Sequence, residues 1–594
     1  MTAAPSAHTP RDLPGPAPRR AGDVRAEKPR AETLRADADG IVLRADVLVV
    51  GGGPAATWSA ISAAEHGARV VLVDKGYCGT SGVAATAGVA HWLVPPDVSR
   101  RDEEIGVREA QGAYLTDRVW ADAVLDETWE RTALVADWGY RTPASGTVPR
   151  VLGFRPGERT FAGSSPDYLR FLRGRVKKSG VTVLDHSPAL ELLRDPAGRI
   201  CGADGYQRQL GRRWRVLAGA VVLATGGTTW RSHSLGGDVD TGEGHLMAAE
   251  VGAHLSSMEF SNFYGMVPLG TSMDKNGYFV RASYWDHEGR PIAYRNLHSS
   301  RAELLAASLR GTVTAQFTQI VGEQRALARA AMPNFFMVAD KLGIDPFTQR
   351  FPMDWVQEGT VRGTGGVRIV DRDAWTGVPG LYAAGDVAAR DRLVGAATGA
   401  GGPNLAWAVA TGTWAGRASA AFAGSRREPV EADVEPTGGL GLRPRAASGA
   451  LVGSDEAWRD VQATVQAHLL PIERSAFRTA DGLADSARVL DGLWADDTAL
   501  TPVAPAGAHA IRTREVAGLL ATARWAVRAA AARTETRGMH TRVDHPHTDP
   551  AQARRLLVGG LDELWVRPDP ERPVVGPAGT DLDSLVGTGR KVAS

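Results

Sequence analysis

A glycine cluster and one aspartate near the start of the sequence have the types and spacing of a dinucleotide-binding site. Gly51 and Gly53 follow the apolar run 47–50, and Asp74 ends a second apolar run. Gly51 would permit a tight turn, Gly53 would let the backbone approach a pyrophosphate, and Ala56 would let a helix pack closely on a strand. The helix N-terminus would offer free N–H groups to phosphates, and Asp74 would accept from ribose hydroxyls. The stretch therefore predicts a strand–helix–strand unit that binds a dinucleotide.

Two later glycine turns indicate further strands beside the same ligand. The apolar run 220–223 closes in Ala-Thr-Gly-Gly, and the segment 377–388 runs into Gly385-Asp386. The segment 395–416 is glycine-rich up to Pro403 and has helical character after it. A helix that starts near Asn404 would direct the positive end of its dipole at whatever lies over the glycine loop.

Composition limits the classes of function. At 594 residues the chain is too long for one core, while 43% apolar and 23% charged residues are ordinary for a globular protein. The net charge of +1 gives no indication of binding to nucleic acid or to an acidic membrane surface. No apolar run approaches the length of a membrane span, and no apolar segment follows Arg19-Arg20. We therefore expect a cytoplasmic protein.

The cysteine content excludes a redox cluster held by this chain alone. Cys78 and Cys201 are too few to ligate an iron–sulfur cluster or a structural zinc ion. We expect no metal site, and a further redox centre would have to lie on another chain.

A series of motifs in a fixed order points to one family. GGGPAA and Asp74 are followed by a loop of small residues (76–92), ATGG, the TGEG segment at 241–255, MEF, GLYAAGD, GGPNL and ETRGMHTRVDHP. In this series the chain resembles the flavoprotein subunit family of succinate dehydrogenase and fumarate reductase, which includes L-aspartate oxidase and the flavin subunit of adenylylsulfate reductase. The resemblance covers about residues 45–550. It implies FAD as the cofactor and hydride transfer at flavin N5.

The same resemblance implies an α/β fold with a bipartite Rossmann-like FAD-binding domain, an inserted α+β capping domain and a C-terminal helical domain. The expected divisions are a disordered leader (1–40), the first part of the FAD-binding domain (41–236), the capping domain (237–354), the second part of the FAD-binding domain (355–430), a linker (431–450), the helical domain (451–560) and an irregular tail (561–594). Apolar spacing also predicts helix over 103–139 and helices across 301–342, and the turn at 287–290 predicts a β-hairpin.

The family's FAD-binding positions transfer well to this sequence. Ser81 stands where succinate dehydrogenases attach FAD covalently through a histidine, so the resemblance implies non-covalent FAD. The positions to which it assigns FAD contacts are Gly51, Gly53, Pro54, Ala55, Ala56, Asp74, Lys75, Ser81, Gly82, Thr86, Ala189, Ala224, Thr225, Gly226, Gly385, Asp386, Gly402, Asn404 and Leu405.

The family's substrate-binding residues do not transfer. Its Gln-Phe-His-Pro-Thr, whose histidine binds a dicarboxylate, reads Asn-Phe-Tyr-Gly-Met at 262–266. The run that carries its catalytic arginine is absent, and Tyr278 stands near that place. Its histidine before Tyr-Thr-x-Gly-Gly corresponds to about Val361, and its arginine before the Gly-Gly-Asn loop to about Gly399. These replacements argue against succinate or fumarate as the substrate.

Three residues are candidates for the catalytic work. Tyr264 replaces the substrate histidine and could relay a proton, or it could be a packing tyrosine with a satisfied hydroxyl. Arg362 lies in a segment that the family places beside the flavin and could hold an anionic group. Arg281 is near the lost catalytic arginine, although strand alternation could direct it to solvent. Arg537 and His540, in the ETRGMHTRVDHP motif, are expected in a structural hydrogen-bond network.

Three functions remain open at this point. The first is an FAD-dependent dehydrogenase or reductase that acts on a carbon–carbon or carbon–nitrogen bond of a small metabolite and exchanges electrons with a separate ferredoxin-like iron–sulfur protein. The second is an O2-using oxidase of the L-aspartate oxidase type. The third is a flavin-binding scaffold or electron relay without catalysis of its own. The sequence does not indicate an oligomeric state.

Overall fold

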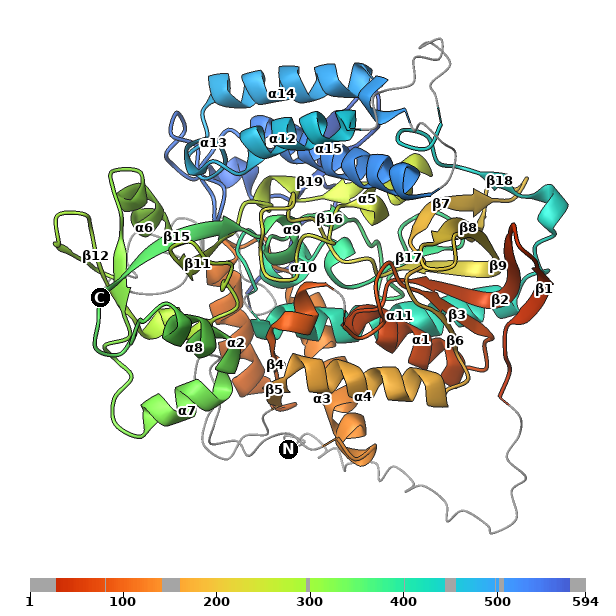
Figure 1. Cartoon of the computed structure of the whole chain (residues 1–594), viewed down its shortest axis with the longest axis horizontal. Coiled ribbons are helices and arrows are strands. Elements are labelled where there is room, and N and C mark those ends of the chain that lie inside the picture. Colours follow the sequence, from red (N-terminus) through yellow and green to blue (C-terminus); the bar gives the residue numbers. More distant parts are fainter. Residues whose placement is uncertain are drawn as a thin grey trace, which may run out of the picture.

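The computed structural model describes residues 28–80, 82–140, 161–294, 300–399, 401–443, 456–496, 498–501 and 507–576, and these have an α/β fold. Figure 1 shows three regions: a main sheet flanked by helices, a smaller sheet-and-helix region in green, and a group of helices in blue. Strands of the main sheet come from both sides of the green region in the sequence.

The main sheet consists of nine strands among the described residues, in the order β18-β7-β8-β9-β2-β3-β6, with β1 beside β2 and β17 beside β9. Its strands are β1 Glu32–Ala36, β2 Gly40–Val50, β3 Val70–Val73, β6 Thr182–Leu184, β7 Ala189–Arg194, β8 Ile200–Gln207, β9 Arg212–Leu223, β17 Leu381–Ala383 and β18 Glu435–Pro436.

The predicted strand–helix–strand unit is present at the centre of this sheet. β2 and β3 pair in parallel and are joined through α1 (Pro54–Glu65). β9 is parallel to β2 and β17 is parallel to β9, so the two later glycine turns follow strands of the same sheet, as predicted. Because parallel strands end at the same edge, all three turns meet there.

Three edges of the expected domain divisions are wrong. β1 lies inside the expected leader and pairs with β2, β18 lies inside the expected linker and pairs with β7, and β20 (Trp565–Pro568) lies inside the expected tail and pairs with β19 (Leu556–Gly559). Each is a short edge strand whose pairing comes from backbone hydrogen bonds to a neighbour, which hydrophobic periodicity does not reveal.

The long helix α11 (Gly401–Gly424) packs against α1 at backbone distance. A Cβ atom at Gly412 would lie 2.5 Å from the Ala55 carbonyl oxygen, and one at Gly416 would lie 2.3 Å from the Ser59 carbonyl oxygen. Any larger residue at either position would therefore force the helices apart. The contact holds the N-termini of the two helices at the same edge of the sheet.

The green region, residues 264–357 without 295–299, is named here the cap segment. Its sheet has the order β11-β15-β14-β12-β13, with the predicted hairpin formed by β12 and β13. The predicted helices across 301–342 are interrupted by β14, whose β-branched surroundings suit a strand. Its elements are β11 Tyr264–Pro268, η4 Gly277–Arg281, β12 Ser283–Trp285, β13 Pro291–Ile292, α6 Arg301–Ser308, β14 Thr314–Gln316, α7 Gln324–Ala331, α8 Pro333–Lys341 and β15 Phe351–Gln357.

The remaining helices pack around these two sheets. The predicted helix over 103–139 is two helices, because Asp117 caps the second of them by accepting from the Val119 and Trp120 amides. The helices are α2 Val98–Gln111, α3 Arg118–Asp137, α4 Ser165–Lys178, α5 Glu243–Glu250, α9 Gly359–Arg362, α10 Asp391–Val394, α12 Ala457–Leu469, α13 Ile472–Ser475, α14 Ala480–Ala495 and α15 Ala508–Ala532. None of the described helices has the length and apolar character that crossing a membrane requires.

Short elements complete the fold. They are β4 Gly88–Ala90 with β5 Ala162–Ser164, β10 Leu255–Ser256 with β16 Gly366–Val367 and β19, and the 3-10 turns η1 Val83–Thr86, η3 Met258–Phe260, η5 Gly385–Val387, η6 Glu431–Asp433, η7 Thr498–Leu500 and η8 Pro550–Gln552.

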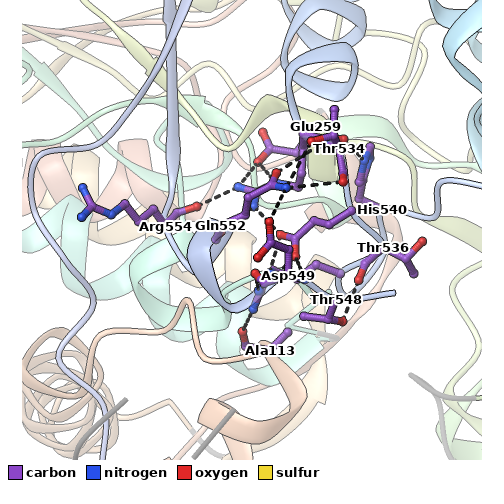
Figure 2. A network of polar contacts seen from close by, with 12 residues as sticks. Ala113, Glu259, Thr534, Thr536, His540, Thr548, Asp549, Gln552 and Arg554 are labelled. Carbon is purple, nitrogen blue, oxygen red and sulfur yellow. Dashed lines mark hydrogen bonds and ion pairs between the residues drawn. The ribbon is translucent and has the colours of Figure 1, made fainter. Parts of the chain in front are cut away.

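The ETRGMHTRVDHP motif forms a buried polar network, as expected (Figure 2). Arg533 forms ion pairs with Glu259 at 2.7 Å and with Glu535 at 2.8 Å, and all three side chains are almost completely buried. Arg537 binds Glu535 at 2.6 Å and donates to the Ala113 carbonyl. The network therefore joins the end of α15 to η3 and to the loop after α2.

Replacing Arg533 with Met should lower the free energy of unfolding by about 3–5 kcal/mol, because Glu259 and Glu535 would stay buried without this cation. Arg528→Met is the matched control. Arg528 is half-exposed near the same end of α15 and pairs with Asp491, so its loss should cost about 1 kcal/mol or less. Urea unfolding followed by circular dichroism measures both. Equal destabilisation by the two variants would contradict the role given to the buried network.

Candidate functional site

A cavity of about 850 Å³ lies between the edge of the main sheet and the cap segment. The glycine turns after β2 and β9, the turn at Gly385 and the first turns of α1 and α11 all face it. The positions with assigned FAD contacts that line the cavity are Gly51, Gly53, Pro54, Ala55, Asp74, Lys75, Gly82, Thr86, Ala189, Ala224, Thr225, Gly226, Gly385, Asp386, Asn404 and Leu405.

Two of the assigned positions are placed differently, and a third is not described. Ala56 is completely buried behind the cavity wall, where it has the packing role expected of the third glycine position. Gly402 is also behind the wall, and its carbonyl accepts from the Trp92 amide at 3.2 Å, while the neighbouring Gly401 lines the cavity. Ser81 lies outside the described residues.

The two glycines of the first turn, Gly51 and Gly53, have different structural roles. Gly51 has φ +126°, and a Cβ atom there would lie 2.1 Å from the Ala224 carbonyl oxygen, so the turn and the sheet both require glycine. Gly53 has an ordinary φ of −79°, and a Cβ atom there would meet no atom of the described residues within 4 Å apart from its chain neighbours. The space beside Gly53 therefore opens into the cavity, where a ligand's phosphates can approach the backbone.

The polar atoms around this turn fit a dinucleotide. α1 begins without a side-chain cap, so its first N–H groups face the cavity. Within the described part of the chain, the buried atoms Thr225 Oγ1 and Asn404 Oδ1 have no hydrogen-bond partner, and both residues line the cavity. Because buried polar groups are normally paired, these atoms indicate a polar ligand between the two helix N-termini.

Lys75 is fixed by residues from two other parts of the chain. Its ammonium group binds Glu243, at the start of α5, at 2.7 Å, and Glu515, in the middle of α15, at 2.8 Å. It also donates to Thr241 Oγ1 at 2.7 Å. The cavity wall beside Asp74 is thus held in place by α5 and by the C-terminal helix α15.

Asp386 is held by a buried arginine. Arg390 forms an ion pair with Asp386 and donates to the Thr360 and Val361 carbonyl oxygens at 2.8 and 2.6 Å. Burial raises the pKa of Asp386, and Arg390 opposes that shift. The pKa of the neighbouring Asp240 is raised well above its usual value by burial and by Asp386.

The cap segment, together with Glu358 and α9 directly after it, contributes a cluster of buried charges to the other end of the cavity. Lys275 binds Asp274 at 2.5 Å, forms an ion pair with Glu358 and donates to Ser234 at 3.0 Å. Arg362 reaches Glu358 at 3.3 Å. The carboxylates of Asp274 and Glu358 are fully buried, and Lys275 is 4% exposed.

The two carboxylates of this cluster have opposite pKa shifts. Burial, and then the charge of Glu358, raise the pKa of Asp274. Burial alone would also raise the pKa of Glu358, but Lys275 and Arg362 lower it below its ordinary value. Neighbouring acids whose pKa values are moved apart in this way are suited to holding and moving a proton.

Two arginines stand beside this cluster. The Arg301 guanidinium lies 4.2 Å from the Phe263 ring centroid and donates to the Tyr264 carbonyl, and burial lowers its pKa to about 10. The Arg362 guanidinium lies 5.5 Å from the same ring. Both residues line the cavity. Arg362 is thus where the sequence predicted a candidate, whereas Arg301 was not anticipated.

The structure contradicts two of the three catalytic predictions. The Tyr264 hydroxyl donates to the Leu470 carbonyl at 2.9 Å, so the side chain faces the helical region, and Tyr264 does not line the cavity. Burial raises the pKa of its hydroxyl, which disfavours proton release. Arg281 donates to the Gln319 carbonyl and to Gln324 on the outer side of the cap segment. In both cases the side chain leaves its strand or turn on the face opposite to the cavity.

Sequence reasoning missed Lys275, Asp274 and Glu358. The only signal was local: a charged pair, Asp274-Lys275, interrupts an otherwise uncharged stretch in a chain whose basic residues are mostly arginine. No group of histidine, cysteine, aspartate and glutamate suited to a metal ion occurs in the described ranges.

Family models match most of the chain. The model described as FAD binding domain matches residues 46–403, and that described as fumarate reductase flavoprotein C-term matches residues 460–559. L-aspartate oxidase from Streptomyces coelicolor is 28% identical over 89% of this chain and 93% of its own length. The fumarate reductase flavoprotein subunit of Mycobacterium tuberculosis is 26% identical over 85% of this chain and 92% of its own.

Solved structures share the fold at lower identity. A mutant of E. coli quinol fumarate reductase FrdA superposes with a TM-score of 0.75 at 21% identity, over 91% of this chain and 99% of that chain. Adenylylsulfate reductase from Archaeoglobus fulgidus gives a TM-score of 0.71 at 16% identity, over 93% of this chain and 99% of that chain.

The two glycines of the first turn should respond differently to substitution. Gly53→Ala should fold normally but bind FAD at least about tenfold more weakly, because its Cβ would occupy the space beside the backbone where the pyrophosphate approaches. Gly51→Ala should destabilise the protein itself, since its Cβ would collide with β9. Flavin content after purification and the unfolding midpoint of the flavin-free protein separate these effects. Full flavin content in Gly53→Ala would contradict the assigned position of the pyrophosphate.

Proposed function

Because the chain belongs to the FAD-dependent oxidoreductase family of succinate dehydrogenase and fumarate reductase flavoprotein subunits, we propose that it transfers a hydride between flavin N5 and a small metabolite, at a carbon–carbon or carbon–nitrogen bond. The observation that carries the proposal is that one cavity joins the glycine turns to the buried charges of the cap segment. A redox cofactor and proton-handling side chains would therefore face the same substrate.

The chain's own residues would hold FAD without a covalent bond. The N–H groups at the start of α1 would bind the pyrophosphate, and Asp74 would accept from a ribose. Asn404 and Leu405, in the first turn of α11, would place the positive end of that helix near the flavin ring. Bound FAD supplies a hydride acceptor or donor. We infer that the cap segment acts as the capping domain that excludes water.

The charge cluster replaces the predicted Tyr264 as the group that handles a proton. Lys275 can give a proton to the substrate, or take one from it, at a position within the cavity. Asp274, whose pKa is raised by burial and by Glu358, can return a proton to Lys275 across 2.5 Å. Arg362 and Arg301 would orient an anionic group of the substrate.

Electrons would pass to or from a separate iron–sulfur protein of the ferredoxin type. Both cysteines are buried, and the described ranges contain no group of histidine, cysteine, aspartate and glutamate suited to a metal ion. The alternative of an oxidase rests on the similarity to L-aspartate oxidase over most of the chain. The alternative of a scaffold without catalysis fits the lost family residues but leaves the buried charges of the cavity unexplained.

Lys275→Met should slow the chemical step by about 10²-fold or more per bound flavin, since Met fills a similar space without an exchangeable proton. Because the variant leaves Asp274 and Glu358 buried without this cation, rates are compared per bound flavin and the unfolding midpoint is measured as well. The measurement is anaerobic re-oxidation of dithionite-reduced flavin by a panel of small α,β-unsaturated carboxylates and imines. Lys341→Met, at the exposed end of α8, is the control. If an active acceptor re-oxidises the flavin of the Lys275→Met variant at the wild-type rate, Lys275 does not take part in the proton transfer.

The rate at which oxygen re-oxidises the reduced flavin distinguishes the dehydrogenase hypothesis from the oxidase hypothesis. If a ferredoxin-like protein is the electron partner, the reduced holoenzyme mixed with air-saturated buffer should re-oxidise slowly and without stoichiometric hydrogen peroxide. Stopped-flow absorbance at the flavin band, with a peroxide assay, measures this. Rapid re-oxidation with one peroxide per flavin would favour the oxidase instead.

A further inference from the structure

Six apolar residues line the cavity on the side of the cap segment. We name this side the apolar arm, formed by Met266, Met273, Phe279, Val280, Met332 and Phe335. The Phe279 and Phe335 rings meet edge to face with centroids 6.0 Å apart and belong to the hydrophobic core of the cap segment. The wall is therefore fixed at these two rings and adaptable at the three methionines.

The apolar arm reaches the main part of the fold through Met332. This residue stands between α7 and α8, and its Cε atom lies 3.9 Å from where a Cβ atom at Gly88 would be. Gly88 begins β4, next to the turn of small residues that lines the flavin side of the cavity. A molecule in the arm would thus be enclosed between the cap segment and the loop over the flavin.

Groups able to bind an anion are gathered at the opposite side of the same space. We name this side the anion end, formed by Asn276, Arg301 and Arg362. Asn276 is 8% exposed and its Oδ1 accepts from the Tyr278 amide at 2.8 Å, while its buried Nδ2 has no partner within the described ranges. An unpaired buried donor and two guanidinium groups that line the same cavity are suited to the oxygens of a carboxylate.

The charges near the anion end leave room for one negative group. Asp274 and Glu358 are already paired with Lys275, and Glu358 also with Arg362. These two carboxylates and the three cations Lys275, Arg301 and Arg362 leave one positive charge uncompensated. Asn334, the polar residue that α8 adds to the lining, is exposed.

We propose that the substrate is an amphipathic monocarboxylate, whose single anionic group binds at the anion end and whose hydrocarbon or aromatic body lies in the apolar arm. This inference rests on the proposed function of the same cavity. A second carboxylate placed in the arm would lose its hydration without gaining a partner, so dicarboxylates are selected against. Each buried methylene group, in contrast, would add affinity.

Binding to the oxidised holoenzyme tests this class without requiring turnover. Butanoate, hexanoate and octanoate are each paired with the dicarboxylate of equal carbon number, and the shift of the flavin absorption band and calorimetry report the dissociation constant. The affinity of the monocarboxylates should rise about fourfold per methylene group. Each dicarboxylate should bind more weakly than the monocarboxylate of equal carbon number. Affinity that is independent of chain length, or tighter binding of the dicarboxylates, would overturn the proposal.

Variants locate the two ends. Met332→Gln should weaken octanoate binding about tenfold and leave butanoate nearly unchanged, because a polar amide would replace the thioether along the arm. Met337→Gln is the matched control, since Met337 is on α8 but 65% exposed. Arg362→Gln should weaken all three monocarboxylates alike. Equal effects of Met332→Gln and Met337→Gln would place the hydrocarbon elsewhere, and flavin content and unfolding midpoints identify a variant that is merely misfolded.

The outcomes distinguish this inference from the proposed function. If monocarboxylates bind as expected but no compound of this class exchanges electrons with the flavin, the binding class stands and the proposed reaction fails. If a substrate with two anionic groups is turned over efficiently, the reaction stands and the inference fails.

Discussion

The close contact between α1 and α11 is the constraint on which the rest of the site depends. Gly412 and Gly416 let one helix lie against the carbonyl oxygens of Ala55 and Ser59, at distances that no side chain would fit. Since the helices come from segments more than three hundred residues apart, the contact sets how the two halves of the main sheet meet. It also directs the N-terminus of α1, which has no side-chain cap, and the N-terminus of α11 toward the same cavity. The unpaired atoms of Thr225 and Asn404 then lie where one dinucleotide could satisfy both.

The cavity combines a site for a highly charged cofactor with a largely apolar substrate region, and burial is what makes the two compatible. Glu358 is shared between Lys275 and Arg362, and Asp274 is paired with Lys275, so these two carboxylates and two cations neutralise one another locally, with both carboxylates fully buried. The cost of burying them is met by short, direct ion pairs. One positive charge remains uncompensated, and it lies next to Phe263, at the boundary between the charged and apolar walls. A site of this kind can select a ligand by the position of its charge and by its hydrocarbon content at the same time.

Sequence reasoning identified the parts of the site that backbone geometry dictates. Gly51, Gly53 and Asp74 are visible in sequence because the turn and the ribose contact demand those residue types, and the strand–glycine turns before Thr225 and Asp386 follow the same rule. The direction in which side chains point was harder to predict from the sequence. Phe263 and Gly265 face the cavity, so Tyr264 between them must face away. A shift of one residue in the alignment along the strand would have turned Tyr264 toward the cavity. Lys275 could not be found because its significance comes from Glu358, which lies on a different element and meets it only in the folded protein.

The position of Lys75 has a consequence for modularity. Separate family models match the flavin-binding stretch and the C-terminal stretch, which would suggest two modules that could be separated or exchanged. Yet Lys75, next to the residue expected to bind ribose, is held by Glu515 of α15 as well as by Glu243 of α5. A fragment ending before α15 would keep every glycine of the cofactor turn but would lose one of the two buried carboxylates that fix its wall. The boundary between the two matched stretches in the sequence is therefore not a boundary in the structure of the cavity wall.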